Sequence, residues 1–354
     1  MNRLHRNQLP ARLTILIIIL LMSAGCATKI KVNMLQPAKY HKASMTKRVA
    51  VLPFSGSGGQ EFAAEIEGVL ANIYVDDKQY FTLVDRTAVD KTMGEMQLSL
   101  SGAIDEKTAA RVGQMVGAEG IYTGVVTLSK CADSYYKERR RECIRHEIKY
   151  DKKGNAYEGK CIRWRNYNVT CTKRAANFSC SPKLIEVNTG RIIYAHNLSG
   201  SAYSSGCEDT NPIRSKHELL RTAKEIAKMQ LRKDVAPYFV SQEIKLMDSK
   251  DGITSKEAKR KLKLGIDYAG KQRMDRACDL WEEARVLSPD SPSILYNLGV
   301  CAESRGDPYT ALTLYKKADK LTGKPDDDIN TAIKRVSAAV KNKQKLEEEL
   351  KEQL

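Results

Sequence analysis

Histidine is scarce in this sequence, and the few that occur stand apart from any nucleophile motif. Only five of the 354 residues are histidine. His5 and His41 lie close to the N-terminus, His146 lies in a basic stretch, and His196 and His217 have no Ser or Cys nucleophile motif beside them. Acid–base and nucleophilic catalysis need such groups gathered in one site. We therefore expect a protein that is not an enzyme, with no catalytic residue and no cofactor.

The apolar run near the N-terminus is too short to cross a membrane. It covers Leu13 to Met22, ten residues, whereas a spanning helix needs about 20. Three arginines precede the run, and the small residues Ser23-Ala24-Gly25 separate it from Cys26. This order is typical of a cleaved export signal. Residues 1–26 are therefore predicted to be a signal peptide.

The small residues directly before Cys26 resemble the processing site of bacterial lipoproteins, although Ser23 stands where Leu is usual. The resemblance implies that Cys26 carries a diacylglycerol and becomes the new N-terminus, and two or three acyl chains anchor a protein stably. The absence of Asp after Cys26 implies the periplasmic face of the outer membrane. Residues 27–47 are then expected to be a polar tether. The alternative is an ordinary cleaved signal with a chance cysteine.

The chain has an excess of positive charge. Its formal net charge is +16, and removal of the three arginines of the signal leaves +13. Such a charge favours anionic partners. For an exported protein these are anionic lipid, lipopolysaccharide or a cell-wall polymer, whereas the export signal argues against nucleic acid.

Strand and helix patterns alternate after the tether. Arg48 to Phe54, Tyr80 to Val84 and Ile121 to Leu128 are short apolar runs that predict strands, and apolar residues recur at helical spacing between them. Asp85 is placed to cap one of these helices, and Gly117 is placed to end another. Strands that alternate with helices predict crossover units on a shared sheet.

Three strings in this region resemble the periplasmic domain of the CsgG-type curli-export lipoprotein family. They are RVAVLPF from Arg48, FTLVDRTAVDKTMGEMQLSLSG from Phe81 and GAEGIYTGVVTLS from Gly117. A related group of outer-membrane lipoproteins, which activates peptidoglycan synthases, has a similar domain. The resemblance covers residues 48–247 apart from an insert, and it implies an α/β fold more specifically than it implies a function.

The insert, residues 129–183, is rich in cysteine and in basic residues, and the chain lacks a CxxC pair there. With one cysteine just beyond it, this region holds six candidates for disulfide bonds: Cys131, Cys143, Cys161, Cys171, Cys180 and Cys207. In an exported protein six such cysteines predict three disulfides of unknown connectivity. A zinc site with His146 as a further ligand is the alternative, but the spacings are wide, so we expect no metal.

The insert lacks the alternation of apolar and polar residues that is expected of a strand facing lipid. In Cys161 to Cys171 one face carries Arg163 and Arg165 and the other carries Asn166 and Asn168. A lipid-facing strand needs a row of apolar side chains. The sequence therefore argues against membrane hairpins like those by which the curli channel spans the membrane.

After the insert, the sequence predicts the elements that close the α/β domain. Asn188-Thr189-Gly190 lies between two apolar runs and predicts a hairpin. Ser215 and Glu218 have the spacing of a capping box before a helix. Tyr238 to Leu246 is expected to be the last strand, and residues 248–254 a linker.

The C-terminal segment, residues 255–354, repeats its pattern after thirty-four residues. This period and these residue types match the tetratricopeptide repeat. Small residues are expected to let paired helices approach, and Trp281 and Tyr315 to fill the space between them. The packing positions are Gly265, Tyr268, Ala277, Trp281, Ala284, Gly299, Ala311, Tyr315 and Ala318. Cys278 and Cys301 fall on helices expected to adjoin and are candidates for one more disulfide. The alternative is a segment that merely packs on the first domain.

The sequence thus predicts an α/β periplasmic domain with a disulfide-rich insert, followed by a short all-α tetratricopeptide solenoid with a capping helix. The function predicted is that of an outer-membrane lipoprotein, a scaffold or adaptor for envelope assembly or secretion that binds protein partners through its repeats. The alternatives are a subunit of an oligomeric export channel and an activator of a peptidoglycan synthase. Whether the chain forms a homo-oligomer is left open.

Overall fold

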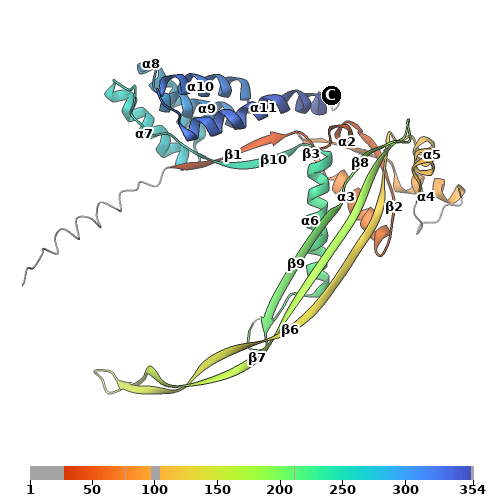
Figure 1. The fold of residues 1–354 in the computed structure, drawn as a ribbon, viewed down its shortest axis with the longest axis horizontal. Helices are drawn as coiled ribbons and strands as arrows, with labels where there is room; N and C mark the ends of the chain where they lie inside the picture. Colours follow the sequence, from red (N-terminus) through yellow and green to blue (C-terminus); the bar gives the residue numbers. More distant parts are fainter. Residues whose placement is uncertain (1–27, 76, 97–103, 211, 352–354) are drawn as a thin grey trace, which may run out of the picture. The chain divides into compact units, whose positions relative to one another are not determined.

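The structure is a computed structural model that describes residues 28–351 apart from 76, 97–103 and 211 (Figure 1). Cys26, the predicted lipidation site, lies outside the described residues. The chain divides into two units. The helical unit contains the described residues up to Gln36 together with Phe239–Gln344, and the sheet unit contains Pro37–Tyr238 and the end of the chain from Lys345.

The sheet unit is a mixed α/β structure built around one short, buried apolar strand. The buried strand β2 pairs in parallel with β5 and with β6, as expected for strands joined by helical crossovers. The main sheet has the order β5-β2-β6-β7-β8, and β9 pairs with β7. These strands are β2 (Arg48–Ser55), β5 (Thr82–Leu83), β6 (Gly120–Tyr150), β7 (Ala156–Glu186), β8 (Ile192–Ala195) and β9 (Leu198–Cys207). A small separate hairpin joins β3 (Tyr74–Val75) to β4 (Lys78–Gln79).

Helices cover both faces of this sheet, which explains why β2 is apolar along its whole length. On one face, Val89 of α4 and Val112 of α5 share a buried cluster with Leu52. On the other face, Phe62 of α3 lies edge-on to Phe54 with ring centroids 5.7 Å apart and packs against Phe178 of β7. The helices of this unit are α2 (His41–Met45), α3 (Gly59–Ala71), α4 (Arg86–Glu95), α5 (Glu106–Val116) and α6 (Lys216–Val235).

The helix ends predicted from the sequence are confirmed. The Asp85 side chain accepts a hydrogen bond from the backbone N–H of Thr87 at the start of α4. Gly117 ends α5 in the left-handed conformation, with φ of 72°. Ser215 and Glu218 form a complete capping box at the start of α6. Local sequence signals therefore fix these boundaries.

The cysteine-rich insert is not a separate excursion, which corrects the expectation for residues 129–183. Its residues continue β6 and β7 without interruption, so that each strand is 31 residues long. The two strands pair antiparallel from Gly120↔Glu186 to Tyr150↔Ala156. A second hairpin joins β7 to β8 around Gly190, as predicted.

The expected tether and domain boundary are also corrected. Residues 27–47 contain the strand β1 (Lys29–Gln36) and the helix α2. Strand β1 pairs with β10 (Tyr238–Lys245) in a two-stranded sheet, so β10 does not close the main sheet as predicted. Ile30 and Val32 of β1 share a buried cluster with Ile244 of β10 and with the C-terminal helices. The helical unit therefore begins before the α/β region and resumes at Phe239.

The remainder of the helical unit consists of helices: α7 (Lys256–Gly270), α8 (Met274–Leu287), α9 (Pro292–Ser304), α10 (Pro308–Leu321) and the part of α11 (Asp327–Lys351) up to Gln344. The Asn297 side chain of α9 holds Met247 by donating to its carbonyl oxygen at 2.8 Å and accepting from its N–H at 3.0 Å. The predicted linker, residues 248–254, therefore begins directly after a residue that is held by α9. None of the helices in the described part of the chain is long and apolar enough to span a membrane.

Candidate functional site: an exposed hairpin arm

The main candidate site is the outer half of the β6–β7 hairpin, residues 137–170, which we call the arm. Strand β9 supports β7 only from Cys180↔Leu198 to Cys171↔Cys207. Beyond Cys171, β6 and β7 pair with each other and with no other described strand. Figure 1 shows this two-stranded ribbon extending past the end of β9. At its inner end Val169 is buried, and Arg140 and Tyr167 contact Asp209 in the segment after β9. Farther out, the arm exposes both faces and both strand edges.

The foot of the arm is fixed by a disulfide and by ion pairs. Cys171 of β7 is bonded to Cys207 at the end of β9. Just below, Arg174 donates two hydrogen bonds to the Asp133 carboxylate, at 2.7 and 2.9 Å, and these bonds lower the pKa of Asp133. A bidentate pair of this kind fixes geometry as well as charge. The hairpin thus leaves the sheet from a rigid base.

Cross-strand side-chain pairs hold the arm itself. Arg165 forms an ion pair with Glu142, and the Arg141 guanidinium lies over the Trp164 ring at 4.1 Å from its centroid. Pairs across an antiparallel ribbon each contribute roughly 0.2–1 kcal/mol. Because a lone two-stranded ribbon buries little apolar surface, it is only marginally stable without further support. The arm gains that support from a second disulfide, between Cys143 and Cys161.

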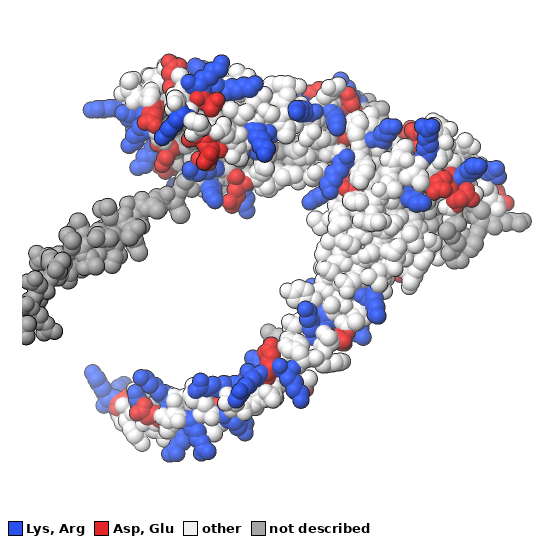
Figure 2. All heavy atoms as spheres, in the orientation of Figure 1, with Lys and Arg blue, Asp and Glu red and all other residues white. Residues whose placement is uncertain are grey.

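The arm carries a strong positive charge. Residues 137–170 contain eleven Lys and Arg against five Asp and Glu. Figure 2 shows the Lys and Arg side chains distributed along the arm, with acidic side chains between them. Large apolar side chains are exposed among these charges, including Tyr135 just below the arm, Ile148, Tyr150 and Ile162. Cationic side chains beside aromatic rings are suited to binding an anionic or polar partner.

The cysteines pair only in part as the sequence predicts. Two disulfides form in the hairpin region, Cys143–Cys161 and Cys171–Cys207, and Cys278–Cys301 joins α8 to α9 in the helical unit. Cys131 and Cys180 carry free thiols, so the expectation of a third hairpin disulfide is corrected. Cys131 lies opposite Ala176 and Cys180 lies opposite Val126, which leaves neither a cysteine across the ladder. Burial raises the pKa of the Cys180 thiol to about 12.

The predicted packing positions of the helical unit come together in pairs. A Cβ added at Gly265 would lie 2.3 Å from Nε1 of Trp281, and one added at Gly299 would lie 2.5 Å from the Tyr315 ring. The Trp281 indole N–H donates to the Leu262 carbonyl oxygen at 3.1 Å. Eight of the nine predicted positions are buried: Gly265, Ala277, Trp281, Ala284, Gly299, Ala311, Tyr315 and Ala318. Tyr268 packs against the same core from its edge.

One polar cluster was missed in the sequence, and a second was considered there only as an alternative zinc site. In the sheet unit, the fully buried Asp234 accepts from the Tyr194 hydroxyl at 3.1 Å and contacts His196 Nδ1 at 2.6 Å. In the arm, His146 lies beside the Cys143–Cys161 disulfide. No sequence signal pairs Asp234 with residues some forty positions earlier, but the Cys-x-x-His spacing at Cys143 was a visible sign of the second cluster.

Comparisons with known proteins give distant similarities only. No protein-family model matches the chain, and no curated protein matches it. Among solved structures, the C-terminal domain of LpoB from Salmonella enterica matches at 14% identity and a TM-score of 0.25, covering 52% of this chain and 91% of that one. Lipoprotein GNA1162 from Neisseria meningitidis matches at 11% identity and 0.22, covering 47% and 87%. The PelC dodecamer from Paraburkholderia phytofirmans matches at 11% and 0.22, covering 59% and 98%. At these TM-scores the similarities support no conclusion about function.

Proposed function

We propose that this protein is a non-enzymatic scaffold of the cell envelope, anchored through Cys26 to the periplasmic face of the outer membrane, that holds two partners at once. The arm is the contact for an anionic envelope component. Helices α7–α10 are tetratricopeptide repeats that bind a protein partner. The observation that carries the proposal is the arm itself, a ribbon fixed firmly at its foot and exposed on both faces beyond it.

The contrast between foot and arm supports a binding role. The foot has a disulfide at the buried Cys171 and the Arg174–Asp133 pair, whereas the arm has exposed cations, rings and open strand edges. Because the foot stabilises the hairpin, the arm can expose these cations, rings and strand edges without destabilising the fold. A partner that binds the arm would bury the side chains and strand edges that the two-stranded ribbon leaves exposed.

Site-specific photocrosslinking tests the two-partner scaffold. A photoreactive residue is placed at Arg139 on the arm or at Val286 on the exposed face of α8, which is 76% accessible. The proposal expects adducts with different partners from the two positions in intact envelopes. Adducts at neither position, or identical adducts at both, contradict a scaffold with two separate contacts.

Charge reversal tests the anionic partner. Arg139→Glu with Arg141→Glu is expected to abolish binding of the purified chain to anionic vesicles or cell-wall polymer. The matched control, Lys320→Glu with Lys324→Glu, makes the same change of net charge in the helical unit and is expected to keep binding. Equal losses in both variants would show a general charge effect and contradict a role for the arm.

One observation favours a second function, that of a subunit in an oligomeric export channel. The arm leaves both strand edges without a described partner, and such edges pair readily with further strands. Mass photometry and negative-stain imaging of the detergent-extracted protein distinguish the two functions. Rings with a central opening support the channel, whereas monomers or small oligomers support the scaffold.

A further inference from the structure

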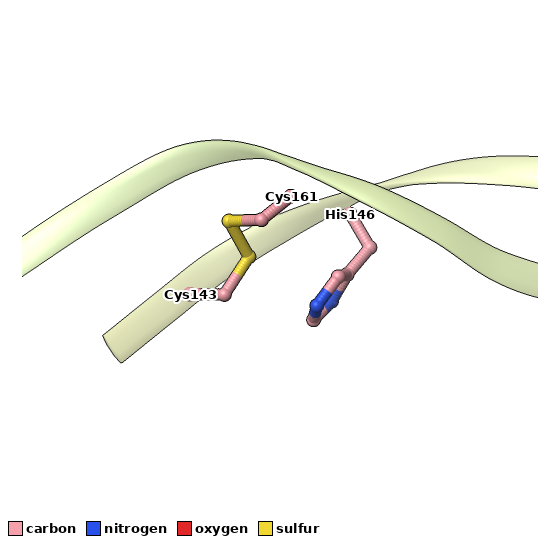
Figure 3. Close-up of side chains that lie close together, drawn as sticks. All are labelled: Cys143, His146 and Cys161. Atoms are coloured by element: carbon pink, nitrogen blue, oxygen red, sulfur yellow. A yellow bond between two sulfur atoms is a disulfide. The ribbon is translucent and has the colours of Figure 1, made fainter. Parts of the chain in front are cut away.

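The arm gathers two sulfur atoms and an imidazole at one place. Cys143 and His146 of β6 and Cys161 of β7 each offer one atom that can bind a metal, and these atoms lie within 4.8 Å of one another. Figure 3 shows the His146 ring on the same side of the ribbon as the disulfide that joins the two cysteines. All three residues are only half-buried, so solvent and ions reach them.

Irregular strand pairing creates this arrangement. In a regular strand, residues three apart point to opposite faces. The β6–β7 register shifts between Cys143 and Arg145 and again between Arg145 and His146. These shifts bring His146 opposite Cys161 and onto the face of the disulfide. Bulges that redirect a side chain in this way are common beside functional sites.

We propose that reduction of the Cys143–Cys161 disulfide converts this cluster into a binding site for a thiophilic divalent cation such as Zn²⁺. A dithiol reductant delivers two electrons and two protons to the disulfide and is itself oxidised to a disulfide. Binding of the cation then displaces the two thiol protons to solvent and forms two metal–sulfur bonds and one metal–nitrogen bond.

The donor set selects the type of metal. Two thiolates and one imidazole suit Zn²⁺ better than the hard cations Mg²⁺ and Ca²⁺, which prefer oxygen. With Zn–S bonds of about 2.3 Å, tetrahedral ligand atoms lie roughly 3.5–4 Å apart. The two sulfur atoms, which are bonded to each other in the disulfide, therefore move apart after reduction. The imidazole nitrogen, which lies within 4.8 Å of them, needs to approach by at most about 1 Å. A water molecule completes the coordination.

A neighbouring carboxylate orients the imidazole. Glu158 Oε2 lies 3.2 Å from Nδ1 of His146. A metal-binding histidine commonly donates its second ring N–H to a carboxylate, which fixes the tautomer that binds the metal. With Nδ1 occupied by Glu158, Nε2 is the nitrogen that binds the cation.

A second cluster provides a comparison within the same hairpin. Glu138, Cys171 and Cys207 also place three candidate ligand atoms within 4.8 Å. There Cys171 is fully buried and Glu138 is held by Arg140 at 3.2 Å. Because Cys171 is fully buried, a reductant reaches the half-buried Cys143–Cys161 disulfide more readily than the Cys171–Cys207 disulfide. The site is therefore assigned to the arm and not to its foot.

Cobalt spectroscopy of the purified full chain tests the proposal. The chain is reduced with a phosphine under anaerobic conditions and titrated with Co²⁺, and the bound cobalt is then displaced with Zn²⁺. The reduced chain is expected to show a sulfur-to-cobalt charge-transfer band that saturates at one ion per chain, and the oxidised chain is expected to show none. A reduced chain without this band overturns the proposal.

Variants assign the ligands. Cys143→Ser with Cys161→Ser is expected to abolish the band, and His146→Ala to weaken zinc binding at least about 10-fold. Cys131→Ser, which removes a free thiol of the same strand, is the matched control and is expected to change nothing. A band that survives in the double serine variant locates the metal elsewhere and contradicts the assignment.

Cysteine alkylation tests the proposal even if reduction of the disulfide loosens the arm. The reduced wild-type chain is alkylated with and without Zn²⁺, and the modified peptides are measured by mass spectrometry. Zinc is expected to slow alkylation of Cys143 and Cys161 and to leave that of Cys131 unchanged. Equal rates at all three cysteines with and without zinc overturn the proposal.

Discussion

The two tryptophans of the chain mark two regions that are stabilised in different ways. Trp281, between α7 and α8, is fully buried, packs on Gly265 and donates to a backbone carbonyl. Trp164, on the arm, remains 45% exposed under the Arg141 guanidinium. The helical unit therefore depends on close packing, whereas the arm depends on cross-strand pairs and a disulfide. Substitutions of exposed residues on the arm are therefore expected to have little effect on folding.

The same substitution at both tryptophans should give the largest difference. Trp281→Ala leaves a cavity between α7 and α8 and is expected to lower the free energy of unfolding by about 3–5 kcal/mol. Trp164→Ala removes only a partly exposed pair and is expected to cost less than about 1 kcal/mol. Denaturant unfolding followed by far-ultraviolet circular dichroism measures both. Similar losses in the two variants would contradict the comparison.

The two hairpin disulfides extend the comparison to foot and arm. Cys171→Ser with Cys207→Ser removes the cross-link between β7 and β9 and is expected to destabilise the sheet unit by about 2–4 kcal/mol. Cys143→Ser with Cys161→Ser is expected to leave the global unfolding transition in place and to speed hydrogen exchange in residues 137–170. The comparison fails if the arm disulfide proves the more important for global unfolding.

The Asn297 contact sharpens the account of the helical unit. Asn297→Ala removes both hydrogen bonds to Met247 and leaves its backbone groups without those partners, which is expected to cost about 1–3 kcal/mol. Asn342→Ala, on the more exposed helix α11, removes one long hydrogen bond to Gln36 and is expected to cost less than about 0.5 kcal/mol. Thermal unfolding of both variants checks the ranking, and a larger loss at Asn342 would reverse it.

The smallest expected effect concerns an ion-pair cluster between α3 and α6. Burial alone raises the pKa of Glu65, but hydrogen bonds from Lys224 and Lys228 outweigh it, so the pKa lies below its ordinary value of 4.5. A lowered pKa stabilises the fold above the ordinary value, and this contribution disappears as the pH falls through the folded-state pKa.

Glu65→Gln is therefore expected to be slightly less stable than the wild type at neutral pH, by under about 1 kcal/mol. The difference should vanish in acid, where protonation has the same effect as the substitution. Urea unfolding between neutral pH and pH below 4 measures it, and a difference that grows in acid would contradict the sign.

Much of the sheet unit could be predicted because its signals are local. Asp85, Gly117 and the Ser215–Glu218 box each act within a few residues, and the structure confirms all of them. The alternation of Ile30, Val32 and Met34 was also a local signal, that of a half-buried strand, yet its partner β10 lies some two hundred residues away. Strand pairing over such a separation leaves no mark in a single sequence, so these residues were assigned to a tether.

The arm was the larger error, and its cause is physical. Its residues alternate poorly because both faces are exposed, so the usual apolar row that identifies a strand is missing. Four of the six cysteines of the hairpin region were correctly interpreted as cross-links, whereas Cys131 and Cys180 are free thiols. Which cysteines pair depends on the register of the strands. Two register shifts between Cys143 and His146 determine the pairing, and no residue type in the sequence indicates where they occur.

The unsupported length of the arm has a mechanical consequence. Strand β7 runs for fifteen residues, 156–170, beyond its last paired residue with β9, which at about 3.3 Å per residue is a reach of about 50 Å. On a lever of that length, a tilt of one degree at the foot displaces the tip by about 1 Å. A partner that pulls on the tip thus exerts its greatest torque at the Cys171–Cys207 bond and the Arg174–Asp133 pair, where the hairpin is clamped.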